Sequence, residues 1–140
     1  MYNSRDEKLI RLTRKIKENP QSFVFILGAG MSRPSGMPSW DELAKGMIDY
    51  YEQLFQDVDE GAKSKAEYLR NMNDNWKVFS ELKRYLPINE YKRYIADKLS
   101  DKGREIPSNY KLIWSLDICG VITFNIDKLI LHAYSSVCAS

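Results

Sequence analysis

The sequence has little of what exported, metal-binding or membrane proteins require. Its two cysteines, Cys119 and Cys138, lie far apart and form no CxxC pair, so neither a zinc site nor a disulfide framework is predicted. No apolar run approaches the ~20 residues of a membrane span. The stretch from Met1 to Pro20 is too charged for a signal peptide. We therefore expect a cytoplasmic protein with no membrane contact and no bound metal.

An excess of charge of one sign is also missing. The 21 basic and 19 acidic side chains leave a formal net charge of +2. Because nucleic-acid binding needs basic residues concentrated on one face, direct binding to DNA or RNA is not expected. The composition, with 44% hydrophobic and 29% charged residues, is that of a globular protein.

Two short apolar runs indicate strands among helical patterns. Residues 22–27 form a continuous apolar run that Gly28 ends, and residues 120–124 form a second, β-branched one. Runs of this length are typical of parallel strands that are buried on both faces. Ser39 and Glu42 form a capping-box pattern at the start of a helix.

Helical spacing of apolar residues accounts for most of the rest of the chain. Helices are expected at residues 5–19, 39–54, 76–86, 88–99, 108–116 and from 126 onward, with one more inside 56–75. The predicted fold class is α/β, a Rossmann-like parallel sheet that is incomplete and carries a large helical insert between its first two strands.

Because two strands are too few for a stable sheet of this kind, residues 1–140 are predicted to be a single partial domain. Its expected parts are residues 1–20 (N-terminal helix), 22–56 (strand, loop and helix), 57–118 (helical insert) and 119–140 (second strand and helix). A helical array with a minimal sheet is the alternative. In the partial domain, the strand residues Val24, Ile26, Val121 and Phe124 would lack neighbours and promote self-association.

The loop after the first strand has the character of a phosphate-binding loop. Gly28 and Gly30 flank Ala29, and a polar stretch with Ser32 and Gly36 follows. Glycines allow sharp turns and close approach of a ligand, and exposed amides complement an anionic diphosphate. The spacing does not match GxGxxG, however. A tight strand-to-helix turn without a ligand remains an alternative.

Two motifs in this chain resemble those of the sirtuin superfamily. The first is Gly28-Ala29-Gly30-Met31-Ser32 followed by Ser35-Gly36-Met37-Pro38 and Trp40, which is similar to GAGxS…SGxPxW/F. The second is Thr123-Phe124-Asn125-Ile126-Asp127, which resembles TQNID, or TTNYD in the bacterial defence branch. Both follow predicted strands, in the order of the family.

The resemblance implies an NAD site with specific roles. The residues that would hold the NAD diphosphate and the adjacent ribose are Gly28, Ala29, Gly30 and Ser32. Pro38 and Trp40 would belong to the loop that covers the nicotinamide side. Asn125 would be the catalytic asparagine, Asp127 would bind the nicotinamide carboxamide, and Thr123 would line the ribose pocket. Without a ligand, Asn125 and Asp127 would be helix N-caps, since both residue types are favoured there.

The chain departs from the family at three points. The family's catalytic histidine lies on a later element, whereas His132 is too close to Asn125 for that role. Position 124 is Phe, where protein-deacylating sirtuins have Gln. The two CxxC pairs of those deacylases have no counterpart here. These departures disfavour a protein deacylase.

The resemblance is to the bacterial sirtuin-like NAD hydrolases of antiphage defence. It implies that NAD is the substrate and that the chain is part of an NAD glycohydrolase, an enzyme if the missing C-terminal half is supplied. A homo-oligomer or a larger defence complex is the implied assembly. The alternatives are a module that binds NAD or ADP-ribose without cleaving it, and a helical interaction module.

Overall fold

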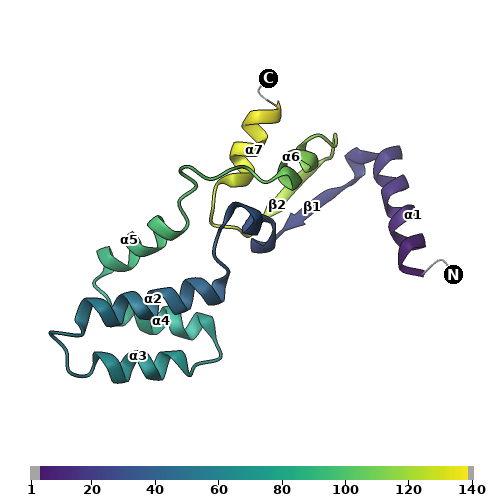
Figure 1. Cartoon of the computed structure of the whole chain (residues 1–140). Coiled ribbons are helices and arrows are strands. Elements are labelled where there is room, and N and C mark those ends of the chain that lie inside the picture. Colours follow the sequence, from purple (N-terminus) through teal and green to yellow (C-terminus); the bar gives the residue numbers. More distant parts are fainter. Residues whose placement is uncertain (1–3, 139–140) are drawn as a thin grey trace. The chain divides into compact units, whose positions relative to one another are not determined.

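The computed structural model describes the backbone of residues 4–138 and the side chains of residues 6–137. The fold is mixed α/β and mostly helical (Figure 1). The elements, including two 3₁₀ helices η1 and η2, are α1 (Ser4–Glu18), η1 (Pro20–Ser22), β1 (Val24–Leu27), η2 (Ala29–Ser35), α2 (Trp40–Phe55), α3 (Ala62–Arg70), α4 (Asn75–Tyr85), α5 (Ile88–Lys98), α6 (Ser108–Trp114), β2 (Gly120–Thr123) and α7 (Leu129–Cys138).

The chain divides into two compact units, which differs from the expected parts. The sheet unit consists of the residues up to Ser35 and from Gly103 onward, and the helical unit is residues 36–102. Sequence analysis assigned α2 to the NAD-binding segment and α6 to the insert. In the structure α2 packs with α3 and α4, whereas α6 packs with α7, so the insert extends over residues 36–102.

The sheet unit is tied together where the chain leaves it and returns. The Ser35 hydroxyl donates to the carbonyl of Glu105 at 2.6 Å. The Arg104 guanidinium donates to the carbonyl of Ser35 at 2.9 Å. These two bonds close the unit on itself without the intervening helices.

The two predicted strands form a two-stranded parallel sheet. Val24 pairs with Gly120 and Leu27 with Thr123, so the strands run in the same direction from end to end. The large helical insert lies between them in sequence, as expected. The loop after β1 and the segment after β2 therefore leave the sheet at the same edge.

The prediction that both faces of the strands are buried is wrong. Val24, Ile26 and Ile122 are 49%, 68% and 50% exposed. Successive side chains of a strand point to opposite faces, so these three belong to one bare face, whereas Leu27 on the other face is buried. An apolar run indicates that both faces of a strand can be buried. In the described part of the chain, other segments cover only the face that carries Leu27. Phe124, directly after β2, is likewise exposed.

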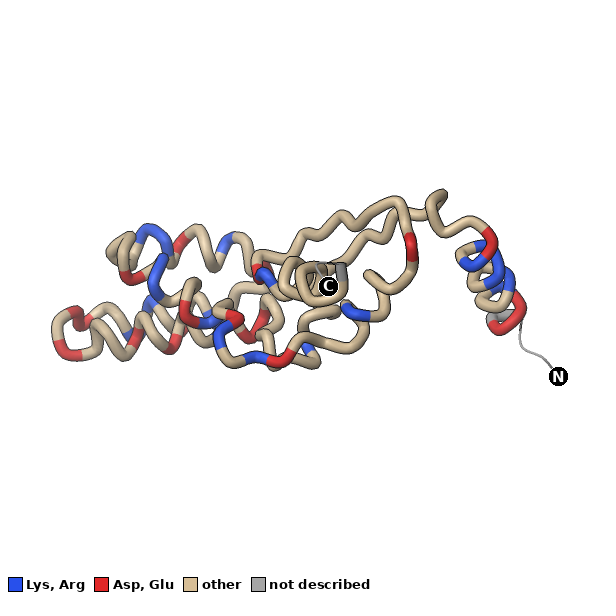
Figure 2. The backbone as a smooth tube through the Cα atoms, turned by 90° about the horizontal axis from the view of Figure 1, so that it is seen from above, with Lys and Arg blue, Asp and Glu red and all other residues tan. Residues whose placement is uncertain are grey.

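Helix α1 forms as predicted, but its apolar side chains remain uncovered. Leu9, Ile10 and Leu12 are 63%, 52% and 46% exposed. Among the described elements, α1 contacts chiefly η1. Figure 2 shows basic and acidic residues along this helix, whereas the two strands carry few charges. The amphipathic pattern thus predicted the helix correctly.

Helices α6 and α7 supply the apolar packing of the sheet unit. The Trp114 indole N–H donates to the carbonyl of Ile130 at 3.1 Å. The rings of Trp114 and Tyr134 pack edge to face, with centroids 4.9 Å apart. The buried apolar residues of this unit are Leu27, Tyr110, Ile113, Leu129, Ile130 and Ala133.

The helical unit has a continuous apolar core between α2, α3, α4 and α5. The predicted capping box at Ser39 and Glu42 is present, with the Ser39 side chain accepting from the Glu42 amide and Glu42 accepting from the Ser39 amide. The members of this core are Leu43, Ala44, Met47, Ile48, Tyr51, Ala62, Ala66, Leu69, Val78, Phe79, Leu82, Leu86 and Tyr94.

Some residues expected in the helical stripes lie outside this core. Trp76 is 74% exposed, and Trp40, Leu54 and Ile88 are also exposed. They stand at or near the ends of their helices, where the pattern extends past the neighbouring helices. None of the helices in residues 4–138 has the length and apolar character that spanning a membrane requires.

Candidate functional site

The two motifs meet in one polar cluster at the carboxyl ends of β1 and β2. Ser32 comes from η2, and Asn125 and Asp127 come from the segment between β2 and α7. The Ser32 hydroxyl donates to the Asp127 carboxylate at 2.8 Å, and the Asn125 amide nitrogen donates to the Ser32 hydroxyl at 3.0 Å. Tyr110 of α6 completes the cluster, with its hydroxyl 2.7 Å from that of Ser32 and 2.8 Å from the Asn125 amide nitrogen.

Counting hydrogens fixes the direction of each bond in this four-residue cluster. A carboxylate has no hydrogen to give, so the single hydroxyl hydrogen of Ser32 goes to Asp127. The hydrogen between Ser32 and Tyr110 must then come from Tyr110. The two amide hydrogens of Asn125 go to the two hydroxyl oxygens. Every donor among these side chains has an acceptor.

One hydrogen-bond acceptor of the cluster has no donor. The carbonyl oxygen Oδ1 of Asn125 is buried and has no hydrogen-bond partner in the protein. A buried polar atom without a partner costs about 1–3 kcal/mol. Asn125 as a residue is partly exposed.

Asp127 belongs to the cluster and also accepts a hydrogen bond from the first turn of α7. Its Oδ1 accepts from the backbone amide of Leu129 at 3.1 Å, at the first residue of α7. Its Oδ2 accepts from Ser32. Oδ1 of Asp127 therefore has the helix-cap role that was the alternative to a ligand site. Oδ2 of the same residue connects the second motif to Ser32 of the first. The Asn125 backbone amide instead donates to the Thr123 hydroxyl at 3.1 Å.

Burial raises the pKa of the Tyr110 phenol above its usual value. The hydrogen bond with Ser32 lowers that pKa, the charge of Asp127 raises it, and the bond with Asn125 lowers it, with a net increase. The ring is fully buried and Ser32 is 1% exposed. Tyr110 therefore keeps its proton at neutral pH and donates it to Ser32.

Of the glycines in the first motif, Gly36 has a left-handed backbone, with φ of 75°, whereas the backbone does not require a glycine at 28 or 30. Neither Gly28 nor Gly30 has a positive φ, and a Cβ built on either residue would meet no atom within 4 Å. The sharp turn expected from these glycines is therefore not what selects them. The open space above both residues is what close approach of another molecule would need. The Met31 amide, by contrast, is bonded to the carbonyl of Gly28 at 3.0 Å.

The remaining predicted site residues fall in two places. Ala29 lies in η2 beside the cluster in sequence, and Thr123 is the last residue of β2. Pro38 and Trp40 belong to the helical unit. There the Trp40 ring packs against Trp76 and Phe79, with centroids 5.7 and 5.8 Å away. Within the sheet unit the structure thus brings Ser32, Asn125 and Asp127 together.

Tyr110 is the member that sequence reasoning missed. It stands three residues before the buried Ile113 on α6, which is the spacing of ordinary core residues. The only available signal was that a buried tyrosine needs a partner for its hydroxyl. His132 lies exposed on α7 and is not a member of the cluster. Among the described residues, no group of three or more His, Cys, Asp or Glu could hold a metal ion.

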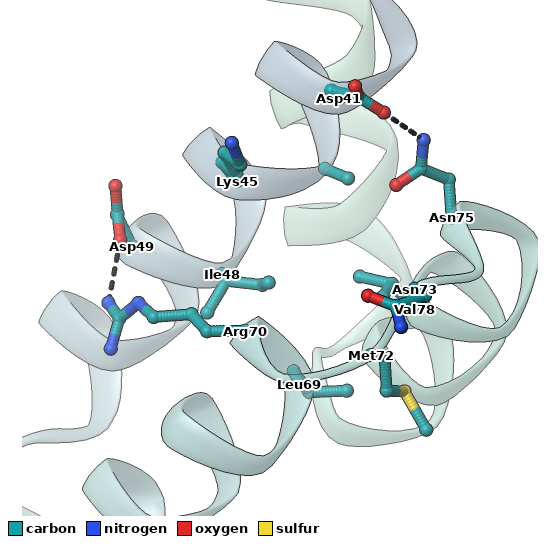
Figure 3. Close-up of a pocket in the computed structure, with 11 residues that line it drawn as sticks. Asp41, Lys45, Ile48, Asp49, Leu69, Arg70, Met72, Asn73, Asn75 and Val78 are labelled. Atoms are coloured by element: carbon teal, nitrogen blue, oxygen red, sulfur yellow. Dashed lines mark hydrogen bonds and ion pairs between the residues drawn. The ribbon is translucent and has the colours of Figure 1, made fainter.

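A second polar region lies on the helical unit (Figure 3). It is an open hollow of about 550 Å³ beside α2 and the end of α3, with Ile48, Leu69 and Val78 at its apolar side. Its charges are largely paired: Arg70 contacts Asp49 at 2.6 Å and Glu52 at 2.5 Å. Asn75 donates to Asp41 at 2.5 Å. Arg70, Asp49, Asp41 and Asn75 of this hollow are thus engaged with one another or with Glu52.

Comparisons of the chain with protein-family models, curated proteins and solved structures found no match. The functional argument consequently depends on the cluster geometry and on the motifs themselves.

Proposed function

We propose that the chain binds NAD at the carboxyl ends of β1 and β2 and provides part of the site for NAD glycohydrolysis. In this reaction water replaces nicotinamide on the ribose, and the products are nicotinamide, ADP-ribose and a proton. The sheet would be the beginning of a Rossmann-like sheet, and the motifs favour a role in an antiphage effector that works as an oligomer or larger complex.

One observation carries the proposal. The hydrogen bond between Asn125 and Ser32 joins two motifs that are 93 residues apart in the sequence. The resemblance assigns both motifs to one NAD site, and this bond between their side chains supports that assignment. Ligands of parallel α/β sheets bind at the carboxyl ends of the strands, which is where this cluster lies.

The chemistry of the cluster suits cleavage of the bond between nicotinamide and ribose. That cleavage builds positive charge on the sugar. The carbonyl of Asn125 would accept a hydrogen from a ribose hydroxyl or from the attacking water, and so orient it without adding a second charge. The Asp127 carboxylate supplies negative charge close to the same point. The open space above Gly28 and Gly30 would admit the diphosphate.

A binding module that does not cleave NAD is the second candidate. Both oxygens of Asp127 already accept hydrogen bonds, from Ser32 and from Leu129. The four-residue cluster contains no imidazole, and each oxygen of its carboxylate already accepts one hydrogen bond. This favours binding of NAD or ADP-ribose without turnover by these residues alone.

The test is calorimetric titration of the chain with NAD, together with measurement of nicotinamide release. Asn125→Ala is the test variant and Asn89→Ala, at an exposed position on α5, is the matched control. We expect NAD binding by the wild type and the control. If the chain hydrolyses NAD, Asn125→Ala should lower the rate about 100-fold or more.

The outcomes separate the candidates. Release that survives in Asn89→Ala and disappears in Asn125→Ala supports a hydrolase. Binding without release supports the binding module. A wild-type chain that binds neither NAD nor ADP-ribose contradicts both.

A further inference from the structure

We propose that Tyr110 is a positioning residue of the NAD site, which fixes the amide of Asn125 so that its carbonyl is left for the ligand. The inference rests on the proposed function for the identity of the ligand. The positioning itself rests on the contacts of α6 with the two motifs.

Tyr110 is held in place from both sides of α6. On one side the Asn109 side chain donates to the carbonyl of Met31 in η2 at 3.4 Å and accepts from the Tyr110 amide at 2.9 Å. On the other side Trp114 donates to the carbonyl of Ile130 in α7. Helix α6 is thereby fastened to the loop after β1 and to the helix after β2. The Tyr110 hydroxyl consequently has a fixed position between Ser32 and Asn125.

The hydroxyl of Tyr110 acts on Asn125 both directly and through Ser32. It accepts one of the two amide hydrogens of Asn125 and gives its own hydrogen to Ser32. If the Asn125 amide were turned over, its carbonyl would face the oxygen of Ser32, whose only hydrogen goes to Asp127. The amide nitrogen would then occupy the buried position where Oδ1 has no partner. The observed orientation gives acceptors to both amide hydrogens of Asn125 and leaves only its Oδ1 without a partner.

This orientation decides what the site can recognise. With its nitrogen directed at Ser32 and Tyr110, Asn125 offers the ligand an acceptor and no donor. Hydroxyl groups and water, which donate hydrogens, fit such a site, whereas a phosphate or carboxylate oxygen does not. The geometry therefore points to a ribose hydroxyl or the attacking water as the group facing Asn125, with the diphosphate elsewhere.

The experiment compares Tyr110→Phe with Tyr134→Phe, a change at a half-exposed tyrosine of α7. The side-chain amide resonances of Asn125 are assigned by their loss in Asn125→Asp. In Tyr110→Phe we expect one of the two amide hydrogens to move upfield and to exchange faster with water, because it has lost its acceptor. In Tyr134→Phe both should stay in place. Unchanged Asn125 resonances in Tyr110→Phe would overturn the inference.

Titration with NAD tests the consequence for the ligand. Tyr110→Phe should bind NAD about three- to tenfold more weakly, the effect of one hydrogen bond. In the Asn125→Ala background the same change should add nothing, because a positioning residue acts only through the group that it positions. A loss of the same size in both backgrounds would mean a general structural role and would contradict positioning.

The two proposals can fail separately. If the wild type binds no NAD, the proposed function is wrong. The claim that the Asn125 carbonyl faces a group of NAD is then wrong as well. The amide spectra of the free protein still decide whether Tyr110 orients Asn125.

Discussion

The two units of the chain use burial in opposite ways. The helical unit buries an apolar core across four helices, and its polar contacts, such as those of Arg70, lie at the surface. The sheet unit has a polar cluster at the carboxyl ends of its strands, in which Ser32 and Tyr110 are buried, while Val24, Ile26 and the apolar residues of α1 remain exposed. Apolar burial is the main stabilising force in folding, and buried polar groups add little net stability. The difference indicates that apolar burial contributes more to stability in the helical unit than in the sheet unit.

The largest effect is expected from a cavity in the helical core. Leu82 is fully buried, and Leu82→Ala should lower the free energy of unfolding by about 2–5 kcal/mol. Leu112→Ala on α6, where the side chain is 64% exposed, is the control and should change it by less than about 0.5 kcal/mol. Chemical denaturation followed by circular dichroism measures both. Equal losses of unfolding free energy in the two variants would contradict the difference between the buried core of the helical unit and the exposed face of α6.

A smaller effect is expected from removing the centre of the polar cluster. Ser32→Ala leaves the Tyr110 hydroxyl and one Asn125 hydrogen without acceptors, and Asp127 Oδ2 without its donor. We expect a loss of about 1–3 kcal/mol in unfolding free energy. Ser115→Ala, which removes an exposed hydroxyl bonded to the carbonyl of Leu112, serves as the control. A stability gain in Ser32→Ala would show that the cluster is maintained against a cost in stability, which would sharpen the comparison further.

The smallest effects separate two glycines of the sheet unit. A Cβ on Gly28 or on Gly103 would meet nothing within 4 Å, but only Gly103 has a left-handed backbone, with φ of 73°. Gly103→Ala should therefore cost about 1–2 kcal/mol. Gly28→Ala should leave the midpoint of thermal unfolding unchanged or slightly higher. If Gly28 is kept open for NAD, the same variant should lose NAD binding; full binding would argue against the proposed approach of the diphosphate.

How much of the fold the sequence predicted depended on whether the signal was local. The capping box at Ser39 and the apolar run that ends at Gly28 are local, and the helix and the strand were found where expected. The exposure of Ile26 was expected only because two strands are too few for a complete sheet, and the exposure of Trp76 was not predictable. A residue is buried only if another segment covers it, and periodicity reports which face is apolar without reporting what lies against it.

The candidate site was predictable only in part for a similar reason. Ser32, Asn125 and Asp127 were identified from motif resemblance, and the structure brings their side chains into contact. Tyr110 came from a helix outside both motifs, and its helical spacing marked it as an ordinary core residue. Its hydroxyl is what distinguishes it, and a partner for that hydroxyl could be recognised only in three dimensions.

The bonds that join Ser35 to Arg104 and Glu105 have a consequence for modularity. The chain leaves and re-enters the sheet unit at the same point. Residues 36–102 are therefore an insertion, here called the cassette, that the sheet unit does not need in order to close. Insertions are tolerated where the ends of a loop lie close together. The cassette could be exchanged for another, or for a short turn, while Ser32 and Tyr110 keep their partners. One scaffold could in this way carry different inserted helices beside an unchanged cluster.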